Sequence, residues 1–156
     1  MTIQAGDLLP HGQFQVMTDS GPQDIDVAEF FANKRVVVMA VPGAFTPTCS
    51  GAHLPGYVQH YDDFLTKGID SIVCLSVNDV YVMDAWGKDQ GVGAIVMAAD
   101  VLGEFTLSMG LEMRGKFGLR SRRYAMLVDN GIVQQMWLEE PGEFSISAAE
   151  QVLQSL

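Results

Sequence analysis

The segment that most constrains the fold is residues 36–41, the continuous apolar run VVVMAV. It is bounded by Lys34-Arg35 before it and by Pro42-Gly43 after it. A strand with one face in water alternates apolar and polar side chains, whereas a strand covered on both faces is apolar throughout. The run therefore predicts a strand inside a sheet that is covered on both faces.

Other segments have the length and apolar content of strands. Residues 70–77 (DSIVCLSV) repeat the buried pattern, residues 94–98 are a shorter example, and residues 14–17 are predicted to form an edge strand. Residues 124–128 and 132–138 flank Asp129-Asn130-Gly131. Asn and Gly tolerate a positive φ, so this stretch predicts a β-hairpin.

Helical patterns lie between the predicted strands. They cover residues 49–66, residues 79–90 with Asn78 as the N-cap, residues 102–109, and a last helix from Ser147, where Glu150 completes a capping box. This alternation predicts an α/β fold with a central mixed β-sheet and helices on both faces, the layout of the thioredoxin-like fold. The sequence has no repeat or linker, so we expect one domain over residues 1–156.

Charge and cysteine content exclude several classes of function. The net charge is −10, so nucleic acid or an anionic membrane would repel the chain. Two cysteines, Cys49 and Cys74, are too few for a disulfide scaffold or a four-thiolate zinc site, and with three histidines they make no metal-ligand pattern. The chain shows no signal peptide and no apolar run of membrane-spanning length. We expect a cytoplasmic protein whose cysteines are either reactive or buried and inert.

The loop after the first buried strand has the pattern of a reactive-cysteine site. Ligands bind beyond the carboxyl ends of strands in open α/β sheets, and residues 42–57 (PGAFTPTCSGAHLPGY) lie at such a place. Thr46 suits the N-cap of a helix and Pro47 its first position, which places Cys49 in the first turn. The unpaired N–H groups and the helix dipole at that end favour a thiolate.

A thiolate at this place needs a cation as well. Lowering a thiol pKa from about 8.5 to about 6 stabilises the anion by about 3.4 kcal/mol, and a helix dipole supplies only about 0.3–1 kcal/mol. Five of the nine basic residues fall in one stretch, which leads into the strand at residue 124: Arg114, Lys116, Arg120, Arg122 and Arg123. An arginine at the start of that strand would lie beside Cys49 if the two strands were neighbours.

Pro55 lies inside the helical pattern that follows Cys49. Its ring would clash with the carbonyl group of Gly51, so we expect a kink or local unwinding there. Such a break would leave the first turn as a mobile unit that carries Cys49.

Three segments resemble the peroxiredoxins, in the type II (peroxiredoxin-five-like) branch. They are PGAFTPTCSGAHLPGY (residues 42–57), SVNDVYVMDAW (residues 76–86) and GLRSRRYAMLVDNGIV (residues 118–133). The similarity covers nearly the whole chain, and the residues that flank the P-x-x-x-T-x-x-C core match too. The resemblance implies a thioredoxin-like fold and a thiol peroxidase that needs no metal, flavin or haem.

The resemblance also implies roles for individual residues. Cys49 matches the peroxidatic cysteine, whose thiolate attacks the O–O bond and becomes a sulfenic acid. Thr46 matches the hydroxyl that hydrogen-bonds thiolate and peroxide, and Pro42 matches the residue that screens the sulfur from water. Arg123 matches the arginine that stabilises the thiolate and the leaving oxygen. The backbone N–H groups of Thr48 and Cys49 would complete an electrostatic hole for the moving charge.

The second cysteine leaves two interpretations open. Cys74 matches a cysteine of the plant-like members, and it is either a packed core thiol or a redox partner of Cys49. No resolving cysteine lies between Phe144 and Ser147. An external thiol is therefore expected to reduce the enzyme, with glutathione or glutaredoxin as the first choice and thioredoxin as the second. The branch also implies a homodimer.

Two other functions use the same residues. A peroxide sensor or redox relay protein would oxidise Cys49 and pass the oxidation to a client protein. A Cys–His hydrolase would use His53, four residues after Cys49, but the sequence identifies no residue that orients this imidazole. A supporting role beside the site is favoured for His53. The basic residues before Arg123 are expected to form a solvated loop.

Overall fold

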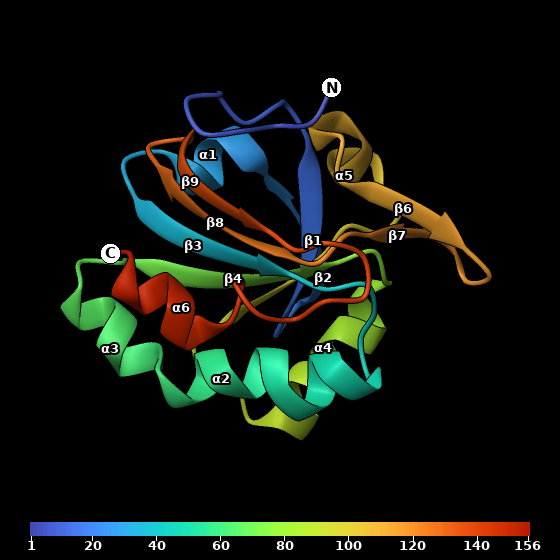
Figure 1. Ribbon diagram of the computed structural model, residues 1–156. Helices are drawn as coiled ribbons and strands as arrows, with labels where there is room; N and C mark the ends of the chain where they lie inside the picture. The colour runs from blue at the N-terminus through green and yellow to red at the C-terminus, as the bar shows by residue number, and fades with distance from the viewer.

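The computed structural model describes residues 1–156 and is built on a seven-stranded mixed sheet (Figure 1). Strands β3, β4 and β5 run parallel, and every other pair of neighbours is antiparallel. A two-stranded ribbon, β6–β7, protrudes from the sheet. In spatial order the sheet contains β2 (Gly21–Asp26), β1 (Gln13–Thr18), β5 (Val96–Ala99), β4 (Ser71–Ser76), β3 (Arg35–Ala40), β8 (Tyr124–Asp129) and β9 (Ile132–Leu138); the ribbon contains β6 (Glu112–Gly115) and β7 (Gly118–Ser121).

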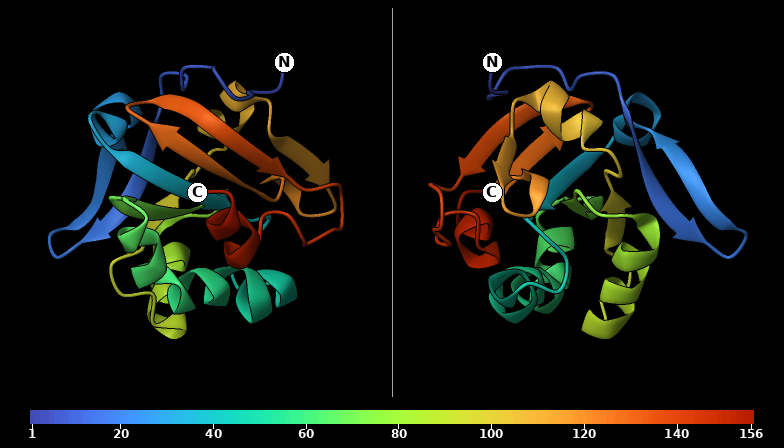
Figure 2. Two further views of the ribbon diagram at one scale, coloured as in Figure 1. Left: turned by 60° about the vertical axis from the view of Figure 1, so that its left-hand side comes forward. Right: turned by 90° about the vertical axis from the view of Figure 1, so that its right-hand side faces the viewer.

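Helices cover both faces of the sheet, as predicted (Figures 1 and 2). One face carries α2 (Leu54–Gln59), α3 (Tyr61–Thr66), α4 (Val80–Gln90) and α6 (Ala149–Gln154); the other carries α1 (Val27–Phe31) and α5 (Glu104–Met109). Two separate clusters of 19 and 18 buried residues lie between the sheet and these layers. No helix is long and apolar enough to cross a bilayer.

The apolar run that predicted the buried strand forms β3 at the middle of the sheet, between β4 and β8. None of its residues is more than 1% exposed, and each fully buried valine contributes about 1.5–3 kcal/mol through burial. The prediction of a strand covered on both faces is confirmed. Its side chains alternate between the two clusters: Val37, Met39 and Val41 on one side, Val36, Val38 and Ala40 on the other.

The predicted hairpin is also confirmed. Strands β8 and β9 are joined by Asn130 and Gly131, whose φ angles are 50° and 79°. The edge-strand prediction for residues 14–17 was wrong, because β1 pairs with both β2 and β5. The edge on this side of the sheet is β2, a polar segment (GPQDID) with no apolar pattern to predict it.

Three predicted helix starts were wrong by one or two residues, and the simplest case is α5, which begins at Glu104 rather than at residue 102. Helix α4 is capped by Asp79, whose side chain accepts a hydrogen bond from the Val82 N–H at 2.9 Å, and Asn78 lies outside the helix. Helix α6 begins after Ala148 without a side-chain cap, because the Ser147 hydroxyl donates to Glu139 instead.

Candidate active site

The helix that carries Cys49 begins at the predicted residue, but the Thr46 hydroxyl donates to the Gly43 carbonyl and accepts no hydrogen bond from the helix N–H groups. Its helical backbone starts at Pro47, and the Ser50 N–H donates to the Thr46 carbonyl at 2.9 Å. The N–H groups of Thr48 and Cys49 lie in this first turn and have no backbone acceptor. They are the unpaired donors of a helix N-terminus, and Cys49, whose side chain is fully buried, belongs to this turn.

The predicted break at Pro55 takes the form of a π-helical segment, Cys49–His53. Because Pro55 has no N–H, the carbonyl of Gly51 loses its usual α-helical donor. The Leu54 N–H reaches back five residues to the carbonyl of Cys49 instead. Cys49 therefore lies in a wider, less regular turn. The single helix predicted over residues 49–66 is divided into this segment, α2 and α3, with a break at His60.

Strand pairing brings one arginine to the thiol. In the antiparallel register of β3 and β8, Ala40 faces Tyr124, so Arg123 lies beside the loop that leaves β3. Its Nη2 donates to the Sγ atom of Cys49 at 3.4 Å, and its Nη1 lies 2.9 Å from Nδ1 of His53. Of the five clustered basic residues, Arg123 is the one that contacts the cysteine.

The expected solvated loop before Arg123 is a structured ribbon. Arg120 donates from its guanidinium to the carbonyl of Val77, and Arg122 donates from Nη2 to the carbonyl of Glu139 at 3.1 Å. Only Arg114 and Lys116 are exposed, near the tip of β6–β7. The loop interpretation was therefore wrong for Arg120 and Arg122, because isolated basic residues give no signal for partners that are distant in sequence.

His53 is fully buried, and both ring nitrogens have partners. A carbonyl oxygen only accepts, so Nε2 donates its proton to the Ser147 carbonyl at 3.2 Å, and the bare Nδ1 accepts from Arg123. Burial, with the adjacent Arg123 cation, lowers the pKa of His53 to about 3, so the ring is neutral. Because neither nitrogen is directed at Cys49, the geometry does not support a Cys–His hydrolase.

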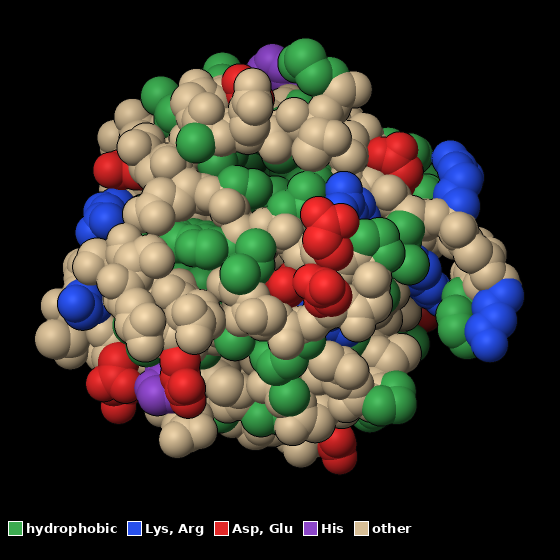
Figure 3. Space-filling model, in the orientation of Figure 1, with side chains coloured by type: hydrophobic (Ala, Val, Ile, Leu, Met, Phe, Trp, Pro, Cys, Tyr) green, Lys and Arg blue, Asp and Glu red, His purple; other side chains and the backbone are tan.

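Thr46 and Pro42 lie on the loop between β3 and this helix. The Thr46 hydroxyl donates its single proton to the Gly43 carbonyl at 2.7 Å, which leaves its oxygen able to accept. Pro42 is half-buried and lines a cavity of about 460 Å³ together with Thr48, Arg123 and Phe144. Acidic side chains gather over the β9–α6 connection beside it, and basic ones over the β6–β7 ribbon (Figure 3).

Sequence reasoning missed two residues that hold this loop and helix. The amide oxygen of Asn78 accepts from the Ala44 N–H at 3.1 Å and from the Ser76 hydroxyl at 2.6 Å. Trp86 is buried and donates from Nε1 to the Ser50 hydroxyl at 2.9 Å. The only signal for the second contact was that a buried indole N–H needs an acceptor.

Cys74 lies on β4 and is fully buried in the same cluster as Cys49. Both cysteines are free thiols. Burial, and to a smaller extent the nearby Cys49, raises the pKa of Cys74 well above its ordinary value. The buried strand position agrees with a packed core thiol.

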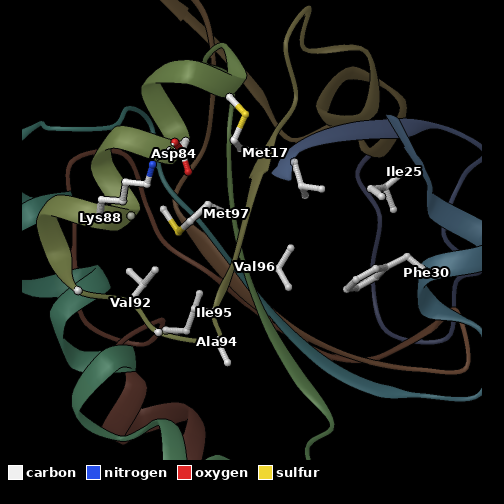
Figure 4. A pocket seen from close by; sticks show the side chains of 14 residues that line it. Met17, Ile25, Phe30, Asp84, Lys88, Val92, Ala94, Ile95, Val96 and Met97 are labelled. Atoms are coloured by element: carbon white, nitrogen blue, oxygen red, sulfur yellow. Dashed lines mark ion pairs between the residues drawn. The ribbon is translucent and has the colours of Figure 1, made fainter. Parts of the chain in front are cut away.

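A larger apolar hollow lies elsewhere in the molecule (Figure 4). Met17, Ile25 and Phe30 line one side of it, and Val92 and Met97 line the other. No predicted site residue lines it, so we assign the site from the thiol and its partners rather than from the size of the hollow.

Comparison with known proteins finds relatives that cover nearly the whole chain. The Redoxin family model matches residues 4–153. The chain is 44% identical to peroxiredoxin-2E of Arabidopsis thaliana, covering 99% of this chain and 70% of that protein. It is 43% identical to peroxiredoxin-2D of the same plant, covering 99% and 98%.

The chain belongs to the peroxiredoxins. The curated relatives that it matches are type II peroxiredoxins, so the predicted type II branch is confirmed. A crystal structure of reduced Prx3 in complex with H2O2 from Vibrio vulnificus superposes with a TM-score of 0.97 at 47% identity, covering 99% of both chains. The predicted thioredoxin-like fold is confirmed by this match. As a peroxiredoxin, the protein is a thiol peroxidase that takes a peroxide and a thiol reductant.

Proposed function

We propose that the protein reduces hydroperoxides through a sulfenic acid at Cys49. The observation that carries the proposal is the Arg123 guanidinium, 3.4 Å from the Cys49 sulfur. The thiolate attacks the terminal peroxide oxygen, and an S–O bond forms as the O–O bond breaks. The departing oxygen takes a proton and leaves as an alcohol or as water. The peroxide is reduced and the sulfur is oxidised.

The surrounding groups act on the charge that moves along the S–O–O axis. The Arg123 cation stabilises the thiolate and then the departing oxygen, and the N–H groups of Thr48 and Cys49 add donors that need no reorganisation. The Thr46 oxygen, whose proton goes to Gly43, accepts a hydrogen bond from the peroxide. Pro42 shields the sulfur from water.

We propose that an external thiol completes the cycle. Cys74 is buried in a β-strand, which favours glutathione or glutaredoxin over an internal disulfide, with thioredoxin as the second choice. Two thiols reduce the sulfenic acid to the thiol and release a disulfide and water. Cys49 is also fully buried, so its turn must open before a thiol can reach it. A homodimer in the cytoplasm is part of the same proposal.

The matched pair Arg123→Gln and Arg114→Gln tests the site. Removing one preorganised donor costs about 100- to 1,000-fold in rate, so Arg123→Gln is expected to slow single-turnover oxidation of Cys49 by hydrogen peroxide by about that factor. Arg114 is exposed on the ribbon, so its replacement removes the same charge with little effect. Equal rates in the two variants would contradict the proposed role of Arg123.

A further inference from the structure

A buried carboxylate that the proposed mechanism does not use lies just after β9. Glu139 is 3% exposed, and its Oε2 atom accepts three hydrogen bonds. The donors are the N–H groups of Ser145 (2.6 Å) and Ser147 (2.9 Å) and the Ser147 hydroxyl (2.6 Å). Burial alone would raise the pKa of Glu139, but these hydrogen bonds outweigh it and hold the pKa below its ordinary value. The group is a carboxylate at neutral pH.

These hydrogen bonds fix the carbonyl group of Ser147. That oxygen accepts from the Tyr57 hydroxyl at 2.7 Å and from Nε2 of His53 at 3.2 Å. It therefore selects the tautomer in which Nε2 carries the proton and Nδ1 is bare. The other tautomer would direct an N–H at the Arg123 guanidinium, which can only donate. Only the tautomer that Ser147 selects can receive the hydrogen bond from Arg123.

Glu139 and its neighbours also hold Arg123 directly. The Glu139 N–H donates to the Arg123 carbonyl at 3.1 Å, so the backbone of the arginine is paired with the end of β9. Phe144, in the same β9–α6 connection, has its ring 5.0 Å from the His53 ring and 5.8 Å from the Arg123 guanidinium. The β9–α6 connection thus contacts both His53 and Arg123 through Phe144.

We propose that Glu139 is a positioning residue that acts on Cys49 through Ser147, His53 and Arg123. The carboxylate holds the Ser147 carbonyl in place, and that carbonyl selects the His53 tautomer. The bare Nδ1 of His53 then accepts from Nη1 of Arg123, which leaves Nη2 directed at the Cys49 sulfur. The consequence for rate rests on the proposed function of Cys49. The tautomer does not depend on that function and is measured separately.

The first test is ¹⁵N NMR of histidine-labelled protein at neutral pH. The wild type is expected to show a protonated Nε2 and a bare Nδ1 for His53, and Glu139→Leu a mixture of tautomers. Glu139→Gln restores an oxygen acceptor and is expected to restore the wild-type signals. Glu140→Leu removes an exposed carboxylate next in sequence and is expected to leave them unchanged. If Glu139→Leu does not fold, Ser147→Ala, which removes one of the three hydrogen bonds, is expected to give a smaller change of the same kind.

The second test is a double-mutant cycle on single-turnover oxidation of Cys49 by hydrogen peroxide. Misplacement of Arg123 in Glu139→Leu is expected to slow the reaction about tenfold. His53→Asn offers an amide oxygen to Arg123 without any tautomer to select. Glu139→Leu added to His53→Asn is therefore expected to cause no further loss.

Two results would overturn the inference: an unchanged His53 tautomer in both Glu139→Leu and Ser147→Ala, or rate losses that multiply in the double variant. If wild-type Cys49 does not react with peroxide, the proposed function fails instead, and the NMR result still decides whether Glu139 selects the tautomer.

Discussion

Thr46 has one hydroxyl proton, and the Gly43 carbonyl takes it at 2.7 Å. The hydroxyl can therefore serve a bound peroxide only as an acceptor. Thr46→Val keeps the shape of the side chain and removes that acceptor, so we expect the rate of Cys49 oxidation to fall by at least about tenfold, a typical loss when one positioned polar group is removed. Thr46→Ser keeps the hydroxyl and is expected to retain most of the rate. Equal losses in both variants, measured by stopped-flow, would contradict this role for the hydroxyl.

The position of some site residues could be predicted from the local sequence, and that of others could not. Thr46, Pro47 and Cys49 are close in sequence, and local helix-start chemistry was enough to put the cysteine in the first turn. Arg123 is 74 residues from Cys49 and meets it only through the β3–β8 register. The resemblance to a family selected it from its basic neighbours, because nothing in its local sequence does so.

The turn that carries Cys49 gives a prediction at the scale of one element. In Pro55→Ala, the new N–H can bond the Gly51 carbonyl, and the π-helical segment can close into a regular α-helix. A firmer turn opens less readily, so we expect reduction of oxidised Cys49 by glutathione to slow several-fold while oxidation by peroxide changes less. Following both half-reactions by rapid quench and mass measurement separates the two steps. A faster or unchanged reduction step would show that opening of this turn does not limit it.

The loop after β3 gives a second prediction at this scale. The Asn78 side chain joins the start of α4 to this loop through the Ala44 N–H. Asn78→Ala leaves the Ala44 N–H without its acceptor, whereas the Ser76 hydroxyl can still donate to the Val41 carbonyl at 3.2 Å. The unpaired N–H is expected to lower the free energy of unfolding by about 1–3 kcal/mol. Asn78→Asp keeps an acceptor oxygen and is expected to lose less. Urea unfolding of the three proteins measures the difference, and equal stability of the alanine variant and the wild type would contradict it.

Element boundaries show why local patterns placed the helices approximately. Asn78 and Ser147 both have the chemistry of an N-cap, but each uses its side chain for a contact distant in sequence. Asp79 is therefore the N-cap residue of α4, and α6 starts without a side-chain N-cap. Local propensity cannot foresee a tertiary partner that competes for the same side chain.

At the scale of the whole molecule, the buried centre of the sheet and the edge strand β9 were predictable, whereas the opposite edge and the protruding ribbon were not. The central strands β3, β4 and β8 are apolar because both faces are covered. The edge strand β2 and the β6–β7 ribbon are polar and exposed, and their pairing leaves little trace in hydrophobic pattern. The contact of Arg123 with Cys49 follows from the register of β3 and β8, which hydrophobic pattern does not specify either, so it needed the structure.

Global stability is expected to depend on the buried neutral His53. Its pKa is lowered to about 3 in the folded protein from 6.5. Between pH 3 and pH 6.5 the imidazole of residue 53 binds a proton in the unfolded chain but not in the folded protein. The contribution of His53 to the free energy of unfolding is therefore complete above pH 6.5 and falls as the pH decreases toward 3. From pH 7 to pH 5 this group is expected to reduce the free energy of unfolding by about 2 kcal/mol.

Urea unfolding at the two pH values checks this expectation. His53→Asn is expected to lose less stability between pH 7 and pH 5 than the wild type. His11→Asn, which changes an exposed histidine, is expected to keep the wild-type dependence. An identical pH dependence in the wild type and His53→Asn would contradict a buried neutral imidazole.

The most direct test of peroxidase chemistry at Cys49 is intact mass after one equivalent of hydrogen peroxide, followed by glutathione. We predict that the reduced wild type gains the mass of one oxygen atom and then exchanges it for a glutathione adduct. Cys49→Ser is predicted to do neither, and Cys74→Ala to do both. Loss of two hydrogens in the wild type would instead show that Cys74 traps Cys49 as a disulfide. No change in mass of the folded, reduced protein would contradict the central claim that Cys49 is the peroxidatic thiol.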